Sequence, residues 1–147
     1  MKITKQQIVN SEPCSDGLEF AKSCNYNMVE IYENCERGDW MIWLLRKAKA
    51  IDKQQTVGIA CLCARRSLVI FEKEYPKENR PRLAIEAAEK WVKNPTKENQ
   101  KICDAAAYAA AYAAAAYAAA YAAADARKSE RKWQADAIRK LISNPFK

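Results

Sequence analysis

Two arginine pairs are the residues in this sequence whose type and spacing best suggest a ligand. Arg65 and Arg66 are adjacent in the chain. Arg80 and Arg82 flank Pro81 at the expected start of a helix. A guanidinium group can donate paired hydrogen bonds to a phosphate or carboxylate, and the free N–H groups at a helix start attract anions. One hypothesis is therefore that these arginines hold a small anionic ligand, such as a nucleotide, between helices or subunits.

Ion pairs inside the protein are the structural alternative for the same arginines. Arg82 can pair with Glu86, one helical turn further on. The adjacent arginine pair lies in a segment rich in large apolar residues. At least one arginine of that pair must therefore point outward or meet a buried acid, which Asp39 or Glu36 could supply. The sequence leaves both interpretations open.

Arg37, Asp39 and Trp40 form a second candidate site, in this case for a protein partner. Arginine and tryptophan are the residue types that most often anchor protein interfaces. The structural alternative is that Gly38 ends one helix as a left-handed C-cap and that Asp39 caps the next helix. Trp40 would then pack inward together with Trp43.

A basic cluster near the C-terminus adds further residues that could contact a partner. The chain carries a net charge of +7, most of it within residues 126–147. Helical spacing places the cluster on one face, which can bind an acidic protein or a phosphate-bearing ligand, or can simply be solvated. Trp133 is the one aromatic residue there for stacking on bases, so nucleic-acid binding is weakly supported. The cluster consists of Arg127, Lys128, Arg131 and Lys132.

The residue types that most enzymes need are missing from the chain. There is no His, which removes the commonest general base, and three Gly cannot build a phosphate-binding loop. The six Cys include no C-x-x-C pair, so we expect no metal site. Because the N-terminus lacks a secretory signal, we expect a cytoplasmic protein whose reduced thiols pack as small hydrophobic groups. We therefore expect a non-enzymatic protein without a cofactor.

Helices must position these candidate residues, because the chain has few Gly and Pro and no convincing strand pattern. Ser15 and Asn25 are candidate N-caps, and Thr96 can cap a further, long helix. Pro76 is expected to follow a helix end. Pro81 falls in the first turn of a helix, where its missing N–H costs nothing. The expected helices before Thr96 cover residues 4–10, 15–24, 25–38, 39–51, 53–75 and 81–94.

The most helix-prone segment is residues 105–126, which contain 17 Ala, four Tyr and one Asp. Alanine has the highest helix propensity of any residue. The tyrosines fall on two opposite sides of such a helix, which favours a central helix packed all round over a flexible linker or a membrane span. We expect this helix at about residues 96–126, a break or bend near Asp125–Ser129, and a basic helix at about residues 127–143.

These elements predict one all-α domain over residues 1–147. Its architecture would be a compact bundle of roughly seven or eight helices around the central Ala/Tyr-rich helix. A chain of 147 residues is long enough for one hydrophobic core. The Ala-rich surface could also pack against a second copy, so a homodimer is an alternative to a monomer.

Two sequence motifs resemble those of a known group of proteins. Residues 35–44, CERGDWMIWL, resemble the signature CERGDWMLWL, and residues 80–88, RPRLAIEAA, resemble the element RPRKAIEAA of the same group. The Ala-rich tract and then a Trp-Gln pair at residues 133–134 follow in the same order, so that the likeness covers residues 14–141. The group is the all-helical Imm-five-like immunity proteins, encoded near bacterial toxin genes and in phage genomes. The resemblance implies an inhibitor that binds and neutralises a toxin or an antiviral-defence protein.

Overall fold

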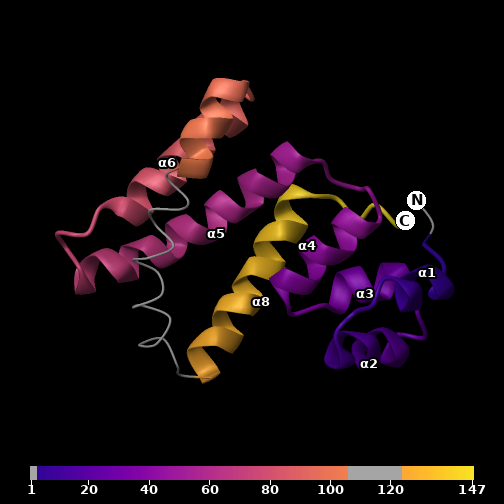
Figure 1. Cartoon of the computed structure of the whole chain (residues 1–147). Helices are drawn as coiled ribbons and strands as arrows, with labels where there is room; N and C mark the ends of the chain where they lie inside the picture. The colour runs from indigo at the N-terminus through magenta and orange to yellow at the C-terminus, as the bar shows by residue number, and fades with distance from the viewer. Residues whose placement is uncertain (1–2, 106–123) are drawn as a thin grey trace. The chain divides into compact units, whose positions relative to one another are not determined.

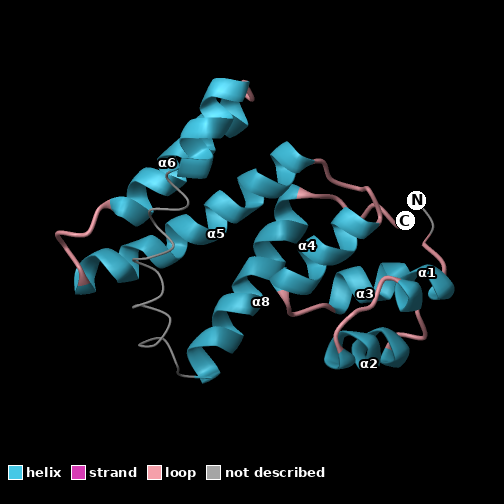
Figure 2. Cartoon of the chain, in the orientation of Figure 1, coloured by secondary structure: helices cyan, strands magenta, loops and turns pink. Residues whose placement is uncertain are grey.

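Helices form all the regular structure in the part of the chain that is described (Figure 1, Figure 2). The computed structural model describes residues 3–105 and 124–147, with side chains except at residues 124–127. The prediction of an all-α fold is confirmed. Residues 97–105 are helical. The other helices are α1 (Lys5–Asn10), α2 (Ser15–Ser23), α3 (Met28–Asn34), α4 (Gly38–Lys47), α5 (Lys53–Glu74), α6 (Arg80–Lys93) and α8 (Ala124–Leu141).

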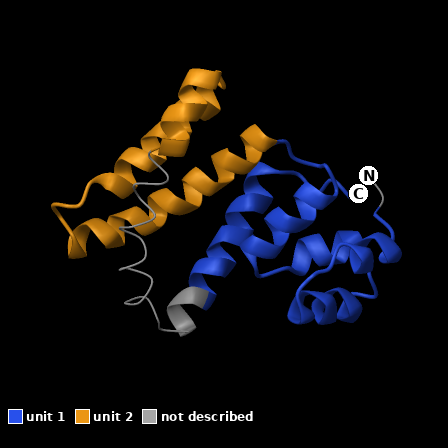
Figure 3. Cartoon of the chain, in the orientation of Figure 1, with its two compact units in different colours: residues 1–52, 128–147 blue, residues 53–127 orange. Residues whose placement is uncertain are grey.

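The contacts within the chain group it into two compact units (Figure 3). Unit 1 combines residues 1–52 with residues 128–147, and unit 2 comprises residues 53–127. Unit 1 is therefore assembled from the two ends of the sequence, and unit 2 is inserted between them. We expected a single domain around the Ala-rich helix. Residues 106–123, the middle of that helix, lie outside the described residues, so its central position stays a prediction.

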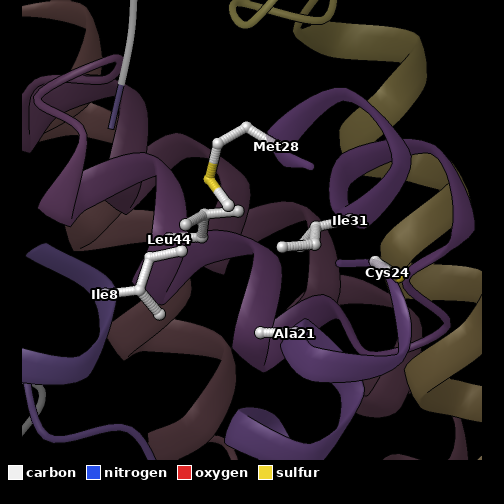
Figure 4. Close-up of a cluster of buried hydrophobic side chains, with 6 residues drawn as sticks. All are labelled: Ile8, Ala21, Cys24, Met28, Ile31 and Leu44. Atoms are coloured by element: carbon white, nitrogen blue, oxygen red, sulfur yellow. The ribbon is translucent and has the colours of Figure 1, made fainter. Parts of the chain in front are cut away.

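A cluster of buried apolar side chains from the first four helices and the loops between them forms the core of unit 1. α8 adds Ala135 and Ile138, which have no exposed surface. Burying a side chain of the size of Ile or Leu contributes roughly 1.5–3 kcal/mol, so these contacts are sufficient to hold α4 against its neighbours. The cluster consists of Ile8, Ala21, Cys24, Met28, Ile31 and Leu44 (Figure 4).

The end of the chain closes unit 1 by binding to α3. The Tyr32 hydroxyl donates a hydrogen bond of 2.6 Å to the carbonyl oxygen of Ile142. The Arg139 guanidinium donates to the carbonyl oxygens of Tyr32, at 3.2 Å, and of Cys35. The ring of Phe146 meets the ring of Tyr32 edge-on, with 6.1 Å between the centroids. These bonds position the segment between α3 and α4, which carries Arg37.

Unit 2 contains a hairpin of the two helices α5 and α6 (Figure 1). α5 ends before Pro76, and Pro81 lies in the first turn of α6, both as the sequence predicts. The adjacent arginines Arg65 and Arg66 both lie on α5. The buried contacts of the hairpin come from Cys61, Leu68 and Ile85, with Val57, Ala64 and Ala88 packed against them.

Gly38 does not end a helix, which corrects the prediction of a left-handed C-cap. It is the first residue of α4, after the N-cap Arg37, and no glycine in the described residues has a positive φ. Asp39 lies in the first turn of α4 and is not its cap. Instead, Gly38 allows α8 to approach the start of α4 closely. A Cβ at this position would lie 2.5 Å from the Cβ of Gln134 and 3.2 Å from the backbone nitrogen of Ala135 on α8.

The N-caps of α2 and α3 also differ from those predicted. Cys14 occupies the N-cap position of α2, and Ser15 is its first helical residue. α3 begins after Asn27, whose side-chain oxygen accepts hydrogen bonds from the first turn. The predicted cap, Asn25, has a φ of 50° and Tyr26 one of 56°. This left-handed turn delays the start of α3 by two residues.

The end of α4 and the continuity of α8 differ from the predictions. α4 ends at Lys47 and not near Ile51, because Lys49 adopts a left-handed φ of 55°. The break expected near Asp125–Ser129 is absent, since α8 is continuous from Ala124 to Leu141. The residues of this stretch include no Gly or Pro, and all of them tolerate a helix. The basic helix therefore begins earlier than expected.

Candidate functional site

The structure brings the two predicted partner-binding sets together on one surface of unit 1. The Nζ of Lys132 on α8 lies 2.7 Å from Oε1 of Glu36, which precedes α4. These two residues are 96 positions apart in the sequence. Gly38 permits this contact, because α8 packs directly on the start of α4. We call this region the α4–α8 surface; its described residues are Glu36, Arg37, Asp39, Trp40, Lys128, Arg131 and Lys132.

Arg37 is held in one position by two neighbours on α4. Its Nε and Nη2 donate hydrogen bonds of 3.0 and 2.5 Å to the two carboxylate oxygens of Asp39. Its guanidinium carbon lies 4.3 Å from the centre of the Trp40 ring, in cation–π geometry. The hydrogen bonds and charge of Asp39 raise the pKa of Arg37. Arg37 therefore presents a fixed positive charge stacked on an aromatic ring.

The charges of α8 act on the acids of this surface. Burial favours a higher pKa for Asp39, but the hydrogen bonds and charge of Arg37 and the charge of Arg131 outweigh it and lower the pKa. The hydrogen bond and charge of Lys132 lower the pKa of Glu36, and Lys128 contributes in the same direction. Both carboxylates are therefore ionised at neutral pH, and Glu36 links the basic face of α8 to the segment before α4 through its ion pair with Lys132.

An apolar cavity of about 340 Å³ opens beside Arg37 and Trp40. Its volume lies within the range of small-ligand pockets. Its buried lining residues are apolar, and its exposed members, which include Asp39, form the mouth. The lining comes from α1, α2, α3, α4 and their flanking segments: Ile8, Pro13, Cys14, Gly17, Phe20, Ala21, Ile31, Cys35, Arg37, Asp39, Trp40, Met41, Trp43 and Leu44.

Gly17 on α2 keeps the mouth of this cavity open. A Cβ at this position would lie 3.3 Å from Sγ of Cys14 and 3.8 Å from the ring of Trp40. The Phe20 ring lies 5.9 Å from the Trp40 ring, centre to centre. The α2 side of the cavity was not predicted from the sequence. The available signal was a glycine inside a helical segment, which often marks a close approach.

The arginines of the predicted anion site lie in unit 2, where Arg65, Arg80 and Arg82 pair with carboxylates. Arg65 on α5 donates hydrogen bonds of 2.8 and 2.7 Å to the carboxylate of Glu89 on α6. The expected internal ion pair therefore forms, but its acid is Glu89. Asp39 and Glu36, the acids considered from the sequence, belong to unit 1 and pair there. Arg66 is exposed on α5.

The other two arginines of that set pair at the start of α6. Arg80 donates to both carboxylate oxygens of Glu78, just before the helix. Arg82 donates to the carboxylate of Glu72 on α5 at 2.7 and 2.6 Å. The predicted contact of Arg82 with Glu86 is also present, at 4.0 Å. An anionic ligand at these arginines would have to displace carboxylates that already bind them.

The side chain of Arg127, a predicted member of the basic cluster, lies outside the described residues.

The described residues give no support for a metal site, a disulfide or a membrane-spanning helix. Among residues 3–105 and 128–147, no three Cys, Asp or Glu side chains gather as metal ligands would. All six cysteines are free thiols. None of the helices in these ranges is long and apolar enough to cross a lipid bilayer.

Comparisons with known proteins identify a family without identifying an activity. No curated protein and no solved structure matches the chain. Residues 36–136 match the sequence model of a family of unknown function, DUF6931. This range covers more than half of the chain and contains the whole α4–α8 surface, whereas α1, α2 and α3 precede it. The chain belongs to the family of unknown function DUF6931.

Proposed function

We propose that this protein is a non-enzymatic inhibitor that binds a protein target through the α4–α8 surface. One observation supports this proposal above all. Two chain segments that lie 96 positions apart in the sequence meet in the structure, and the ion pair of Lys132 with Glu36 joins them. One segment carries an Arg–Trp pair of the kind that anchors interfaces, and the other carries the basic residues Lys128, Arg131 and Lys132. Their meeting puts a fixed Arg–Trp pair and the basic residues of α8 on the same side of unit 1.

The chemistry of this surface suits an acidic protein partner. Arg37 stacks on Trp40 and is fixed by Asp39, so little side-chain entropy is lost when it is covered. Arginine and tryptophan in such a position are typical interface anchors. The surface carries four basic and two acidic residues, and this excess of positive charge would attract an acidic partner and speed its association.

The target class is an inference from the sequence resemblance. The likeness of residues 35–44 and 80–88 to Imm-five-like immunity proteins supports a toxin or an antiviral-defence protein as the target. Such a role places the protein in the cytoplasm, where its six free thiols would stay reduced. The alternative, sequestration of a nucleotide, has less support, because Arg65, Arg80 and Arg82 are bound to carboxylates and the sequence resemblance points to a protein target.

Co-purification from bacterial cells that express a candidate toxin or defence system tests the proposal. The wild-type protein should retain one protein at a fixed ratio and protect the cells. The variant Lys128→Glu/Lys132→Glu should reduce the retained amount on the order of tenfold, because charge at the surface governs encounter with the partner. The matched control is Lys22→Glu/Lys140→Glu, which changes two exposed lysines of unit 1 outside the α4–α8 surface.

The control variant should retain the partner as the wild type does. The proposal is wrong if the wild type retains no stoichiometric protein and gives no protection. It is also wrong if both double variants bind equally well. Equal urea midpoints for the two variants would establish that a loss of binding does not arise from unfolding.

A further inference from the structure

The apolar cavity adjoins the α4–α8 surface. Binding of a partner by the charges of that surface does not use the cavity, so the cavity needs an explanation of its own. Resting on the proposed function, we propose that the cavity is the anchor site for an aromatic side chain of the protein partner, presented on an acidic segment. The mouth and the α4–α8 surface share Arg37, Asp39 and Trp40. One bound segment would therefore contact both.

The walls of the cavity favour an aromatic occupant. The rings of Phe20 and Trp40 are tilted by 37° with centroids 5.9 Å apart, and Trp43 adds a third ring to the lining. Aromatic rings pack preferentially on tilted or edge-on neighbours. Cys14 and Met41 also line the cavity, and sulfur-containing side chains pack well against ring edges.

The buried side chains that line the cavity are apolar apart from one thiol. Ala21, Ile31 and Leu44 are buried there. The Cys35 thiol is buried too, and it donates a weak hydrogen bond of 3.3 Å to the carbonyl oxygen of Arg37. A polar side chain placed at this depth would lose its hydration without gaining a partner. The occupant must therefore be apolar at its tip.

The charge at the mouth selects the residues that flank this aromatic group. Arg37 and Asp39 pair at the mouth, and the excess of positive charge beside it comes from Lys128, Arg131 and Lys132 on α8, which Glu36 offsets in part. Carboxylates next to the aromatic residue would meet these cations, whereas lysines would be repelled. An apolar centre with a charged rim is the usual arrangement of an interface hot spot.

Protection of Cys14 from alkylation by iodoacetamide tests the inference directly. Cys14 is exposed and lines the cavity, whereas Cys63 and Cys103 lie in unit 2 and serve as internal references. The probe is the acetylated peptide Asp-Glu-Trp-Glu-Asp at millimolar concentration. Peptides with Ala in place of Trp, peptides with Lys in place of the acids, and free indole are the comparisons. Peptide mass mapping gives the alkylation rate of each thiol.

We expect the acidic Trp peptide to slow alkylation of Cys14 at least threefold and to leave both references unchanged. The Ala and Lys peptides should protect much less. Absence of protection, or equal protection by the Ala peptide, would overturn the inference. Equal protection by the Lys peptide or by indole at the same concentration would also overturn it, because the site would then bind an apolar group regardless of an acidic segment.

The second test fills the cavity by mutation and measures how tightly the full chain binds its partner. Gly17→Leu places an apolar side chain against Trp40, and Gly58→Leu makes the same change in α5, where the nearest atom is Val92 Cγ1 at 3.8 Å. Gly17→Leu should weaken partner binding at least tenfold, and Gly58→Leu should not. If Gly17→Leu lowers the urea midpoint, Gly17→Ala replaces it, with a smaller loss expected.

The failure of this inference can be told apart from the failure of the proposed function. If the wild type binds a partner and Gly17→Leu binds it equally well, the α4–α8 surface acts alone and the anchor site is wrong. If the wild type binds no protein, the inhibitor proposal is wrong, and the peptide experiment still decides whether the cavity accepts an aromatic group.

Discussion

At Gly38 the absence of a side chain determines whether α8 can reach α4. A Cβ there would lie 2.5 Å from the Cβ of Gln134 and close to the backbone of Ala135. The backbone of a helix cannot move aside as the end of a flexible side chain can. Gly38→Ala should therefore lower the free energy of unfolding by about 1–3 kcal/mol, as overpacking does. Urea unfolding followed by circular dichroism measures it.

Gly58→Ala is the matched control for this change. Gly58 lies inside α5, and the nearest atom to a Cβ there is Val92 Cγ1 at 3.8 Å, an ordinary contact. Because alanine is the better helix former, Gly58→Ala should raise stability by about 0.5–1 kcal/mol. A Gly38→Ala variant as stable as the wild type would contradict the account of the α4–α8 contact.

At the scale of elements, the α5–α6 hairpin shows how an ion pair links two helices. The side chains of Arg65 and Glu89 are each 34% exposed, so solvent weakens their attraction. A double-mutant cycle with Arg65→Ala and Glu89→Ala should give a coupling of roughly 0.2–1 kcal/mol at pH 7. Urea unfolding of the four chains provides the measurement.

The coupling energy between Arg65 and Glu89 should change with pH in a defined direction. The hydrogen bonds from Arg65 lower the pKa of Glu89 from its ordinary value of 4.5. The coupling is therefore fully present above pH 4.5 and is lost as the pH falls through the lowered pKa, where the folded protein takes up the proton. A coupling that persists unchanged once Glu89 is protonated would mean that packing, and not charge, joins the two residues.

At the scale of the whole molecule, the two ends of the chain depend on each other. Residues 143–147 carry Phe146, which packs edge-on against Tyr32, and Lys147, whose Nζ lies 2.7 Å from Glu33. Removing these residues should lower the stability of unit 1 by about 1–3 kcal/mol, which corresponds to amide exchange in α3 that is roughly five- to 150-fold faster. Hydrogen exchange with mass spectrometry resolves the effect by segment.

The exchange of α5 and α6 should not change in the truncated chain, because these helices form a separate compact unit. An equal acceleration throughout the chain would show instead that the units unfold together. This outcome would favour the single domain that the sequence predicts. Unchanged exchange in α3 would mean that α8 holds unit 1 without the final residues.

The sequence by itself determined features that depend on a few neighbouring residues. It predicted α1, whose N-cap Thr4 bonds to Gln7 in a capping box, and α5 and α6, which Pro76 and Pro81 delimit. It also identified Arg37, Asp39 and Trp40 as a unit. Prolines and helix propensities act within one or two helical turns, so their effects can be read directly from the chain. The caps of α2, α3 and α4 were predicted wrongly, because the path of the chain between helices decides which residue takes the cap position.

Only the tertiary structure decided where these elements meet. The role of Gly38, the acid that pairs with Arg65, and the cavity beside Trp40 all depend on one helix packing against another. Lys132 and Glu36 lie 96 positions apart, and no local pattern links them. Their contact follows from how apolar surfaces fit together, because close packing depends on the shape of both partners at once.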